Sequence, residues 1–260
     1  MLIISATNCI SCCFDSDIKI EPKSSFGEAE VYFTETKDIR SRYPELKNFT
    51  TRWEQLKGDK FYFDEDRETY IACHALLRLI LSKKLTINPL DISFINERNT
   101  KPGLIGNPIY FNITHTREAL ALAISRDHYV GIDLENSNRS IDFASVIESF
   151  FSKKESEFIL ESKDDSSDRF FLIWTRKEAL LKALGTGIIT DLTHIEVSDH
   201  KNIINRKSID NLVGDSVFNE HFIYSGKILN FFLSVALPQR AEIIINKING
   251  ENINSFLDYY

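Results

Sequence analysis

Two carboxylates lie at alternate positions of one short apolar segment, Gly131-Ile132-Asp133-Leu134-Glu135. If this segment forms a strand, Ile132 and Leu134 point into a core, while Asp133 and Glu135 share the opposite face, about 7 Å apart at the backbone. Such hard oxygen donors suit Mg²⁺, which proteins bind through one or two carboxylates together with water and substrate phosphates. We expect Gly131 on that face to leave room for a ligand. The alternative is a half-buried strand whose acidic face is only solvated.

A second group of chemically capable residues is spaced as on one side of a helix. Trp174, Glu178 and Lys182 stand at positions i, i+4 and i+8, so they share one side if the segment is helical. A carboxylate and an ammonium group on one side could bind a metal ion and a phosphate together. The alternative is an ordinary surface pair of Glu and Lys, which stabilises a helix by roughly a few tenths of a kcal/mol.

A lysine in a predicted turn and a Thr-His pair complete the candidate residues. Lys101 precedes Pro102-Gly103, a dipeptide typical of turns, and a lysine there is a point charge suited to phosphate. Thr114 and His115 follow an apolar segment and could contact a phosphate or a base. The alternative for His115 is a surface position without a ligand.

These residues need a framework of strands and helices to bring them together, and the hydrophobic pattern predicts one. Apolar positions spaced by three and four predict helices over 67–83 and 168–184, the second ending at Gly185. The polar stretch 136–168 is also helical in pattern. Alternating segments predict strands at 30–34, 92–95, 109–113, 119–124, 129–134, 194–197, 222–224, 231–237 and 241–245. We expect hairpins between 119–124 and 129–134 and between 222–224 and 231–237.

The two halves of the chain repeat the same order of elements, a long helix followed by antiparallel strands. The first predicted helix contains Ala-Leu-Leu-Arg at 75–78 and the second Ala-Leu-Leu-Lys at 179–182. This repetition favours an α+β fold of two similar subdomains related by a pseudo-twofold axis, each a long helix packed on a small antiparallel sheet. We expect the subdomains to span 1–138 and 139–260, with the active site at their junction. Coincidence is the alternative explanation for the short repeat.

Composition and charge exclude several classes of protein. The chain of 260 residues has a formal net charge of −7, which argues against a general nucleic-acid-binding protein. It has no run of about 18 apolar residues, and its first residues do not resemble a secretory signal, so we expect a cytoplasmic protein without a membrane partner. The cysteines lack the paired spacing of a zinc site. The motifs G-x-x-x-x-G-K-[ST] and G-x-G-x-x-G are missing, which leaves a different Mg²⁺-dependent nucleotide enzyme without support.

The order of the motifs resembles that of the 4′-phosphopantetheinyl transferases, of the two-subdomain type that activates nonribosomal peptide and polyketide synthases. The resemblance rests on Lys101-Pro102-Gly103, Phe111-Asn112-Ile113-Thr114-His115, Gly131-Ile132-Asp133-Leu134-Glu135 and Trp174-Thr175-Arg176-Lys177-Glu178-Ala179-Leu180-Leu181-Lys182. The last two motifs, about 40 residues apart, form the specific combination. The best-matching part spans about residues 61–187, half of the chain.

The resemblance implies an enzyme that transfers the phosphopantetheine arm of coenzyme A to a serine of an apo acyl or peptidyl carrier protein and releases adenosine 3′,5′-bisphosphate. Asp133, Glu135 and Glu178 would hold Mg²⁺, with Mn²⁺ as an option. Glu178 would also take the serine proton. Lys182 would steady the leaving phosphate, and Lys177 would assist in binding coenzyme A. The alternative within the family is a non-catalytic member that binds coenzyme A or a carrier protein.

The resemblance also implies where coenzyme A binds. The family positions near the 3′-phosphate and the adenosine are matched by Lys101, Thr114 and His115. We expect Lys57 and Arg67 to supply further basic contacts there. The chain departs from the pattern at Thr69, where some members carry an arginine.

The carrier protein is expected to dock on the polar stretch 140–162, near the junction of the subdomains. Carrier proteins are commonly acidic near the modified serine, so Lys153 and Lys154 could steer them electrostatically. The acidic residues of the same stretch oppose that steering. A monomer is expected, because one chain already provides both subdomains.

Overall fold

The structure, a computed structural model, describes residues 2–4, 27–95, 101–106, 108–140, 144–186, 192–198, 201–203 and 220–257. Its strands are β1 (Leu2–Ile4), β2 (Gly27–Glu35), β3 (Phe94–Ile95), β4 (Gly103–Leu104), β5 (Tyr110–His115), β6 (Ala119–Ser125), β7 (Gly131–Asn136), β8 (Lys201–Ile203), β9 (Glu220–Ile228), β10 (Phe231–Leu237) and β11 (Ala241–Lys247). Its helices are α1 (Thr36–Arg40), α2 (Tyr43–Leu46), α3 (Arg52–Gly58), α4 (Asp64–Leu85), α5 (Ala144–Phe150), α6 (Lys153–Leu160), α7 (Ser166–Leu184) and α8 (Asn254–Leu257), with 3₁₀ turns η1 (Lys47–Phe49) and η2 (Pro89–Asp91). These elements confirm the predicted mixture of helices and small, mainly antiparallel sheets.

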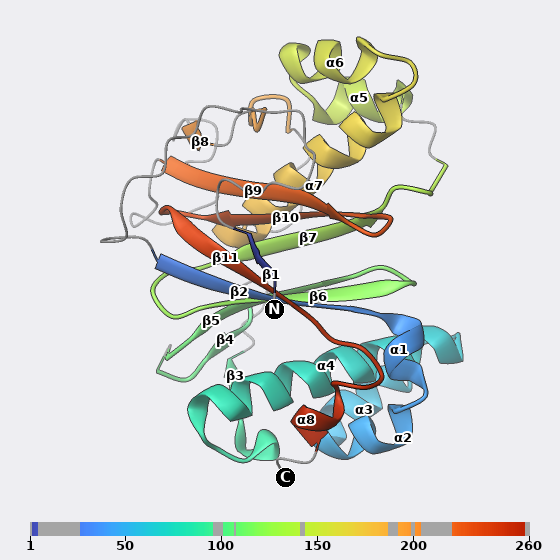
Figure 1. Ribbon diagram of the computed structural model, residues 1–260, viewed down its shortest axis with the longest axis vertical. Helices are drawn as coiled ribbons and strands as arrows, with labels where there is room; N and C mark the ends of the chain where they lie inside the picture. Colours follow the sequence, from blue (N-terminus) through green and yellow to red (C-terminus); the bar gives the residue numbers. More distant parts are fainter. Residues whose placement is uncertain are drawn as a thin grey trace.

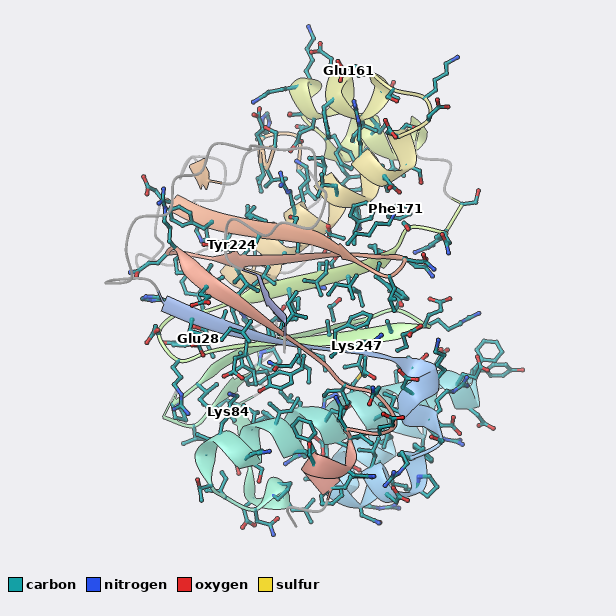
Figure 2. All side chains as sticks on the ribbon, in the orientation of Figure 1. Glu28, Lys84, Glu161, Phe171, Tyr224 and Lys247 are labelled. Atoms are coloured by element: carbon teal, nitrogen blue, oxygen red, sulfur yellow. The ribbon has the colours of Figure 1, made fainter. Side chains whose placement is uncertain are left out.

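Four layers follow one another in the order helix, sheet, sheet, helix (Figure 1). A five-stranded sheet, β1-β11-β2-β6-β5, faces a four-stranded sheet, β7-β10-β9-β8. Side chains fill the space between them (Figure 2), among them Val31, Phe33, Ile132 and Leu134, each at most 2% exposed. Helix α4 covers the outer face of the first sheet, and α7 covers the outer face of the second.

The alternation of side chains along each strand explains why both faces of a sheet are occupied. On β2, Phe33 points into the space between the sheets, whereas Tyr32 belongs to the cluster around α4. On β7, Ile132 points between the sheets, whereas Asp133 faces α7. The strand predicted from the acidic motif therefore forms, and its carboxylates lie on the face opposite the core between the sheets.

The two long helices form where their periodicity predicts them. Helix α7 ends at Gly185, whose positive φ of 70° is the left-handed conformation that favours glycine. Helix α4 begins with three acidic residues and ends with Lys83 and Lys84, charges that complement the helix dipole. None of the described helices is long and apolar enough to cross a membrane.

Gly131 lets helix α7 approach strand β7 backbone to backbone. A Cβ atom on this residue would lie 2.0 Å from the carbonyl oxygen of Ala179 and 2.3 Å from the amide nitrogen of Ala183. The expectation that Gly131 leaves room for a ligand is therefore wrong, because the helix fills that space. The close approach instead brings the turn that carries Glu178 and Lys182 over β7.

Two predicted β features differ from the structure. The hairpin between 119–124 and 129–134 is wrong, because β6 pairs with β2 and β5, whereas β7 pairs with β10. Residues 194–197 form a turn and irregular chain instead of a strand. Side chains replace the hydrogen bonds that a neighbouring strand would make there. The Val197 amide, for example, donates to the Glu155 carboxylate at 2.8 Å. The hairpin predicted for 222–224 and 231–237 is confirmed as β9 and β10.

Strand pairing crosses the boundary expected between 1–138 and 139–260. Strand β7 precedes this boundary but pairs with β10. Strand β11, from the other side of the boundary, lies between β1 and β2 and is parallel to β2. Both larger sheets thus combine strands from the two ranges, whereas β3 and β4 form a two-stranded sheet within the first range. The pseudo-twofold pair of subdomains with these limits stays a prediction.

Replacing Gly131 by alanine should destabilise the fold, because the added methyl group would overlap the backbone of α7. Overpacking a well-packed interior costs about 1–3 kcal/mol, and we expect the upper end because backbone cannot move aside easily. Gly226→Ala is the matched control, since this β9 glycine has nothing within 4 Å of its Cβ position. Urea titration measures both free energies of unfolding. Equal losses in the two variants would contradict the close contact at Gly131.

Candidate functional site

Asp133 is the centre of a polar cluster between β5, β7 and α7. Only 5% of this residue is exposed. The Lys182 Nζ atom lies 2.6 Å from the Asp133 Oδ1 atom and 3.1 Å from the Thr114 Oγ1 atom. Thr114 donates to the same carboxylate oxygen at 3.2 Å. The ammonium group therefore balances the charge of the carboxylate, and the hydroxyl group orients it.

The second oxygen of the Asp133 carboxylate, Oδ2, is buried and lacks a hydrogen-bond partner in the described part of the chain. An unsatisfied buried polar atom costs on the order of 1–3 kcal/mol. Such atoms in native proteins usually have a reason, for example an ion or a water molecule bound there. Asp133 thus offers one oxygen that is available to a ligand.

Glu135 and Glu178 lie close enough to Asp133 to respond to its charge. Burial raises the pKa of both carboxyl groups, and the negative charge of Asp133 raises it further. The ammonium group of Lys182 acts in the opposite direction on both. Glu135 also accepts a hydrogen bond from Trp174, which lowers its pKa in part. Carboxylates that repel one another in this way would be relieved by a bound cation.

Oxygen ligands for a metal ion would come from Asp133, Glu135 and Glu178. Across the described ranges, however, no three His, Cys, Asp or Glu side chains already stand in an arrangement that could hold a metal ion. Mg²⁺ does not require such a cage, because it binds through one or two carboxylates together with water and substrate phosphates. The Asp133 oxygen that has no partner in the described ranges and the neighbouring acids fit an Mg²⁺ ion that binds together with a phosphate group.

Lys101 lies at the start of β7 rather than beside Asp133. Its ammonium group donates to the carbonyl oxygen of Val130, and its side chain lies close to Gly185 at the end of α7. Burial lowers the pKa of Lys101 to about 7. The ammonium group is therefore only partly protonated at neutral pH, and a bound anion would favour its charged form.

His115 follows Thr114 on β5, and its side chain reaches the surface at the edge of the polar cluster. Packing around the ring lowers its pKa, and electrostatic interaction with Lys182 and His74 lowers it further. The imidazole is therefore mainly neutral at pH 7. Three residues predicted from the sequence, Thr114, His115 and Lys182, thus lie together.

Tyr70 and His74 extend this region on helix α4, and they are not among the site residues predicted from the sequence. Their ring centres are 4.3 Å apart. The His74 Nδ1 atom lies 3.4 Å from the Glu54 Oε1 atom, and the buried Tyr70 hydroxyl has no partner among the described residues. Their spacing of four on a helix was the available signal. Nothing in the sequence indicated that this side of α4 faces His115.

Lys57 and Arg67, expected near the adenosine, lie on α3 and α4. The Lys57 Nζ atom is 5.4 Å from the ring centres of both Trp53 and Tyr70. Arg67 pairs instead with Asp64 at 3.0 Å. No hydrogen bond or ion pair joins either residue to the polar cluster in the part of the chain that the structure describes. Lys57 is linked to that cluster only through the aromatic surface of α4.

Lys177 is buried in an ion pair, so the prediction that it binds coenzyme A is corrected. Its side chain is 0% exposed, and its Nζ atom lies 2.8 Å from the Glu155 Oε2 atom. It also donates to the carbonyl oxygens of Leu192, at 2.9 Å, and Ile195. Successive helical positions point about 100° apart, so Lys177 faces α6 and the segment 192–198 while Lys182 faces Asp133.

The stretch 140–162, expected to receive the carrier protein, contains α5 and α6; residues 141–143 lie outside the described part. Ile147 and Phe151 are buried in the cluster beside α7. The side chain of Lys153 is 93% exposed, whereas Lys154 pairs with Glu196 at 2.8 Å. Docking of a carrier protein on this stretch stays a prediction.

Removing the Lys177 ammonium group should destabilise the protein strongly. Lys177→Met leaves the Glu155 carboxylate buried without its cation, and breaking one partner of a buried pair costs about 3–5 kcal/mol. Lys153→Met is the control, because that exposed lysine is 3.9 Å from its partner Glu157 and should matter little. Denaturant titration measures both variants. A Lys177→Met protein as stable as the control would contradict the buried ion pair.

Proteins of known family match the region that carries this cluster. A sequence model of the 4′-phosphopantetheinyl transferase superfamily matches residues 129–225, which include β7 and α7. The 4′-phosphopantetheinyl transferase HetI from Nostoc sp. strain PCC 7120 is 33% identical over 151 residues, which are 56% of this chain and 63% of that protein. The 4′-phosphopantetheinyl transferase ffp from Bacillus subtilis is 30% identical over 158 residues, 60% of this chain and 69% of that protein. The chain thus spans less than two thirds of the first relative and slightly more of the second. Since the carboxylates of β7 and the Glu178–Lys182 turn of α7 fall inside the matched region, the chain belongs to the 4′-phosphopantetheinyl transferase superfamily.

Proposed function

We propose that the protein transfers the 4′-phosphopantetheine moiety of coenzyme A to a serine of an apo acyl or peptidyl carrier protein, with Mg²⁺. The observation that carries the proposal is the Asp133 Oδ2 atom, which has no hydrogen-bond partner among the described residues and belongs to the carboxylate that pairs with Lys182. Glu135 and Glu178 lie near enough for the charge of Asp133 to raise their pKa. Acids and a cation in one cluster suit a pyrophosphate and its metal ion. The names of the related proteins support the transfer reaction.

The metal ion would be held by Asp133, Glu135 and Glu178. When bound, it would neutralise the negative charge of the pyrophosphate oxygens that increases during the transfer. Thr114 keeps the Asp133 carboxylate oriented for this purpose through its hydrogen bond. The burial that raises the pKa of the two glutamates also strengthens their attraction for a cation.

Glu178 and Lys182 would act on the two ends of the reacting group. The serine oxygen forms a bond to phosphorus while the bond from phosphorus to the oxygen of adenosine 3′,5′-bisphosphate breaks. Glu178 is suited to take the serine proton, because its raised pKa makes it a stronger base than an ordinary carboxylate. Lys182 stands one turn further on α7, where its ammonium group could hold the leaving phosphate.

The adenosine and the 3′-phosphate would bind beside β5. Thr114 and His115 provide a hydroxyl and a neutral imidazole there, and Lys101 provides an ammonium group whose charge an anion would restore. The aromatic pair of Tyr70 and His74 lies between Lys57 and His115 and could stack on a base. We also propose that the positive charge of Arg67 attracts the 3′-phosphate of coenzyme A at long range.

A non-catalytic member that binds coenzyme A is the competing function, and two observations favour it. Lys182 already pairs with Asp133 at 2.6 Å, and no three acids in the described residues are arranged for a metal ion. A protein that only binds coenzyme A could keep this ion pair intact. A transfer assay distinguishes the two functions.

Incubation with coenzyme A, Mg²⁺ and an apo carrier protein should increase the mass of the carrier by one phosphopantetheine group. Asp133→Asn should lower kcat by about 100-fold or more, because the metal ligand loses its charge. Glu178→Gln should lower kcat by about 100- to 10,000-fold, because a general base is removed. Mass spectrometry of the carrier measures each rate.

Glu251→Gln is the matched control for these variants, since this exposed glutamate lies in the turn before α8, outside the polar cluster and the stretch 140–162, and should leave the rate unchanged. Circular dichroism checks that every variant is folded. Coenzyme A binding without any mass gain across several carriers would favour the non-catalytic member. Full activity in Asp133→Asn or Glu178→Gln would show that other residues carry the reaction.

The KM for coenzyme A should rise by roughly tenfold as the pH increases from about 6 to about 8, because Lys101 loses its proton in this interval. The KM rises with pH because burial lowers the pKa of Lys101 to about 7. Below that pH the free enzyme carries the ammonium group, and above it a neutral amine that attracts phosphate less. Lys101→Met should have a high KM at all these pH values and a much flatter profile. A wild-type profile that the substitution does not change would exclude Lys101 from the phosphate site.

A further inference from the structure

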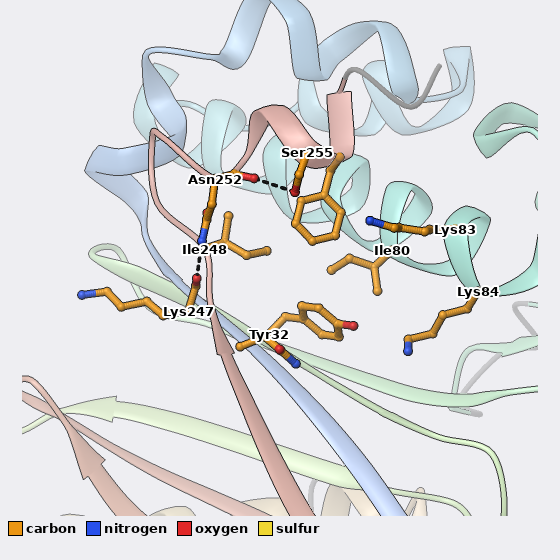
Figure 3. A pocket seen from close by; sticks show the side chains of 10 residues that line it. Tyr32, Ile80, Lys83, Lys84, Lys247, Ile248, Asn252 and Ser255 are labelled. Carbon is orange, nitrogen blue, oxygen red and sulfur yellow. Dashed lines mark hydrogen bonds between the residues drawn. The ribbon is translucent and has the colours of Figure 1, made fainter. Parts of the chain in front are cut away.

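A groove on the α4 side of the five-stranded sheet shares no residue with the Asp133 cluster (Figure 3). It lies between the last turns of α4, the strands β2 and β11, and helix α8. Its volume is about 410 Å³, which is in the range of small-ligand sites. The residues that matter for its chemistry are Tyr32, Ile80, Lys83, Lys84, Ile248 and Phe256.

Two aromatic rings and two isoleucines form the apolar part of the groove. The ring centres of Tyr32 and Phe256 are 6.3 Å apart, and the ring planes are inclined by 81°. Ile80 and Ile248 are buried beside them in the cluster around α4. Figure 3 shows Tyr32, Ile80 and Ile248 converging on one hollow, which Phe256 of α8 also lines. Such a lining favours a flat, apolar ligand body.

The lysines give the groove an excess of positive charge, which lies at Lys83. Lys84 pairs with Glu30, so its charge is already balanced. The Lys83 Nζ atom lies 5.2 Å from the centre of the Phe256 ring, and no carboxylate pairs with it among the residues the structure describes. In Figure 3 the side chain of Lys83 points toward the hollow, whereas that of Lys247 points away from it. None of the described residues that line the groove is acidic, so a ligand with one negative charge would complement it.

Hydrogen bonds fix the wall that α8 contributes. The Asn252 side chain donates to the carbonyl oxygen of Lys247 at 2.8 Å, and the Ser255 hydroxyl donates to the carbonyl oxygen of Asn252 at 2.8 Å. On the opposite wall, the Tyr32 hydroxyl donates to Glu30 at 2.6 Å. Burial and this carboxylate raise the pKa of Tyr32, so the phenol stays protonated. Both walls are therefore held in place without a ligand.

We propose that this groove binds a small aromatic monoanion, with its ring against the apolar wall that Tyr32 and Phe256 form together and its anionic group at the Lys83 ammonium group. An aromatic carboxylate has this chemistry. The flat body satisfies the apolar walls, and the single charge matches the one ammonium group that faces the hollow without a carboxylate partner in the described part of the chain. The site is independent of the transfer reaction.

Titration of the isotope-labelled full chain with 2-naphthoate, followed by amide NMR, tests the proposal. We expect the shifts to concentrate at 80–84 and 246–256, the segments that line the groove. Lys83→Met should weaken 2-naphthoate binding by about fivefold or more, because a charge-assisted contact is lost. Lys83 is exposed, so this substitution should leave the fold intact. The neutral isostere 2-naphthamide should bind the wild type as weakly as 2-naphthoate binds Lys83→Met.

Lys37→Met is the matched control, because this lysine is also exposed but pairs with Glu35 outside the groove; it should bind 2-naphthoate like the wild type. Equal affinities of the acid and the amide would overturn the proposal, as would undiminished binding to Lys83→Met. Shifts centred on His115 and Lys182 would also overturn it, because the anion would then occupy the Asp133 region. Absence of any shift at millimolar 2-naphthoate would exclude the site.

Discussion

The contact between the backbone of β7 and the backbone of α7 positions everything else in the candidate site. Because Gly131 has no side chain, the helix lies against the strand at the level of Ala179 and Ala183. Glu178 and Lys182 belong to the same turn, so this contact sets their height above the strand. Asp133, two residues after Gly131, then lies within 2.6 Å of the Lys182 ammonium group. A larger residue at 131 would separate the acid of the strand from the base and the cation of the helix.

Two lysines on α7 illustrate how one kind of interaction serves different purposes. Lys177 and Lys182 each pair with a buried carboxylate. The carboxylate of Glu155 is fully used, since one oxygen meets Lys177 and the other accepts from the Val197 amide. The carboxylate of Asp133 keeps one oxygen without a partner in the described structure. A carboxylate whose two oxygens both have partners stabilises the fold. A carboxylate oxygen without a partner in the described structure can bind a cation or a water molecule.

Local patterns predicted much of the fold, and long-range pairing explains most of what they missed. Strand alternation correctly separated Asp133 from Ile132, and the helical spacing of Glu178 and Lys182 correctly placed both on one side. The strand at 129–134 was right, but its partner was wrong, because adjacency in sequence does not decide which sheet receives a strand. The buried position of Lys177 depends on α6 and residues 192–198, and the contact of His74 depends on Glu54 from α3. Such contacts join segments distant in sequence, so no short motif contains them.

Strand β11 has a consequence for the order in which the chain can fold. It lies between β1 and β2, although more than 200 residues separate it from either of them along the chain. More than 200 residues must therefore leave the ribosome after β2 before the five-stranded sheet can close. Until then one edge of β2 exposes unpaired backbone groups, and open edges of this kind invite pairing with other chains. A topology with such distant partners folds slowly because a long loop must be ordered first. Synthesis of this chain thus includes an interval in which self-association competes with the pairing of β11.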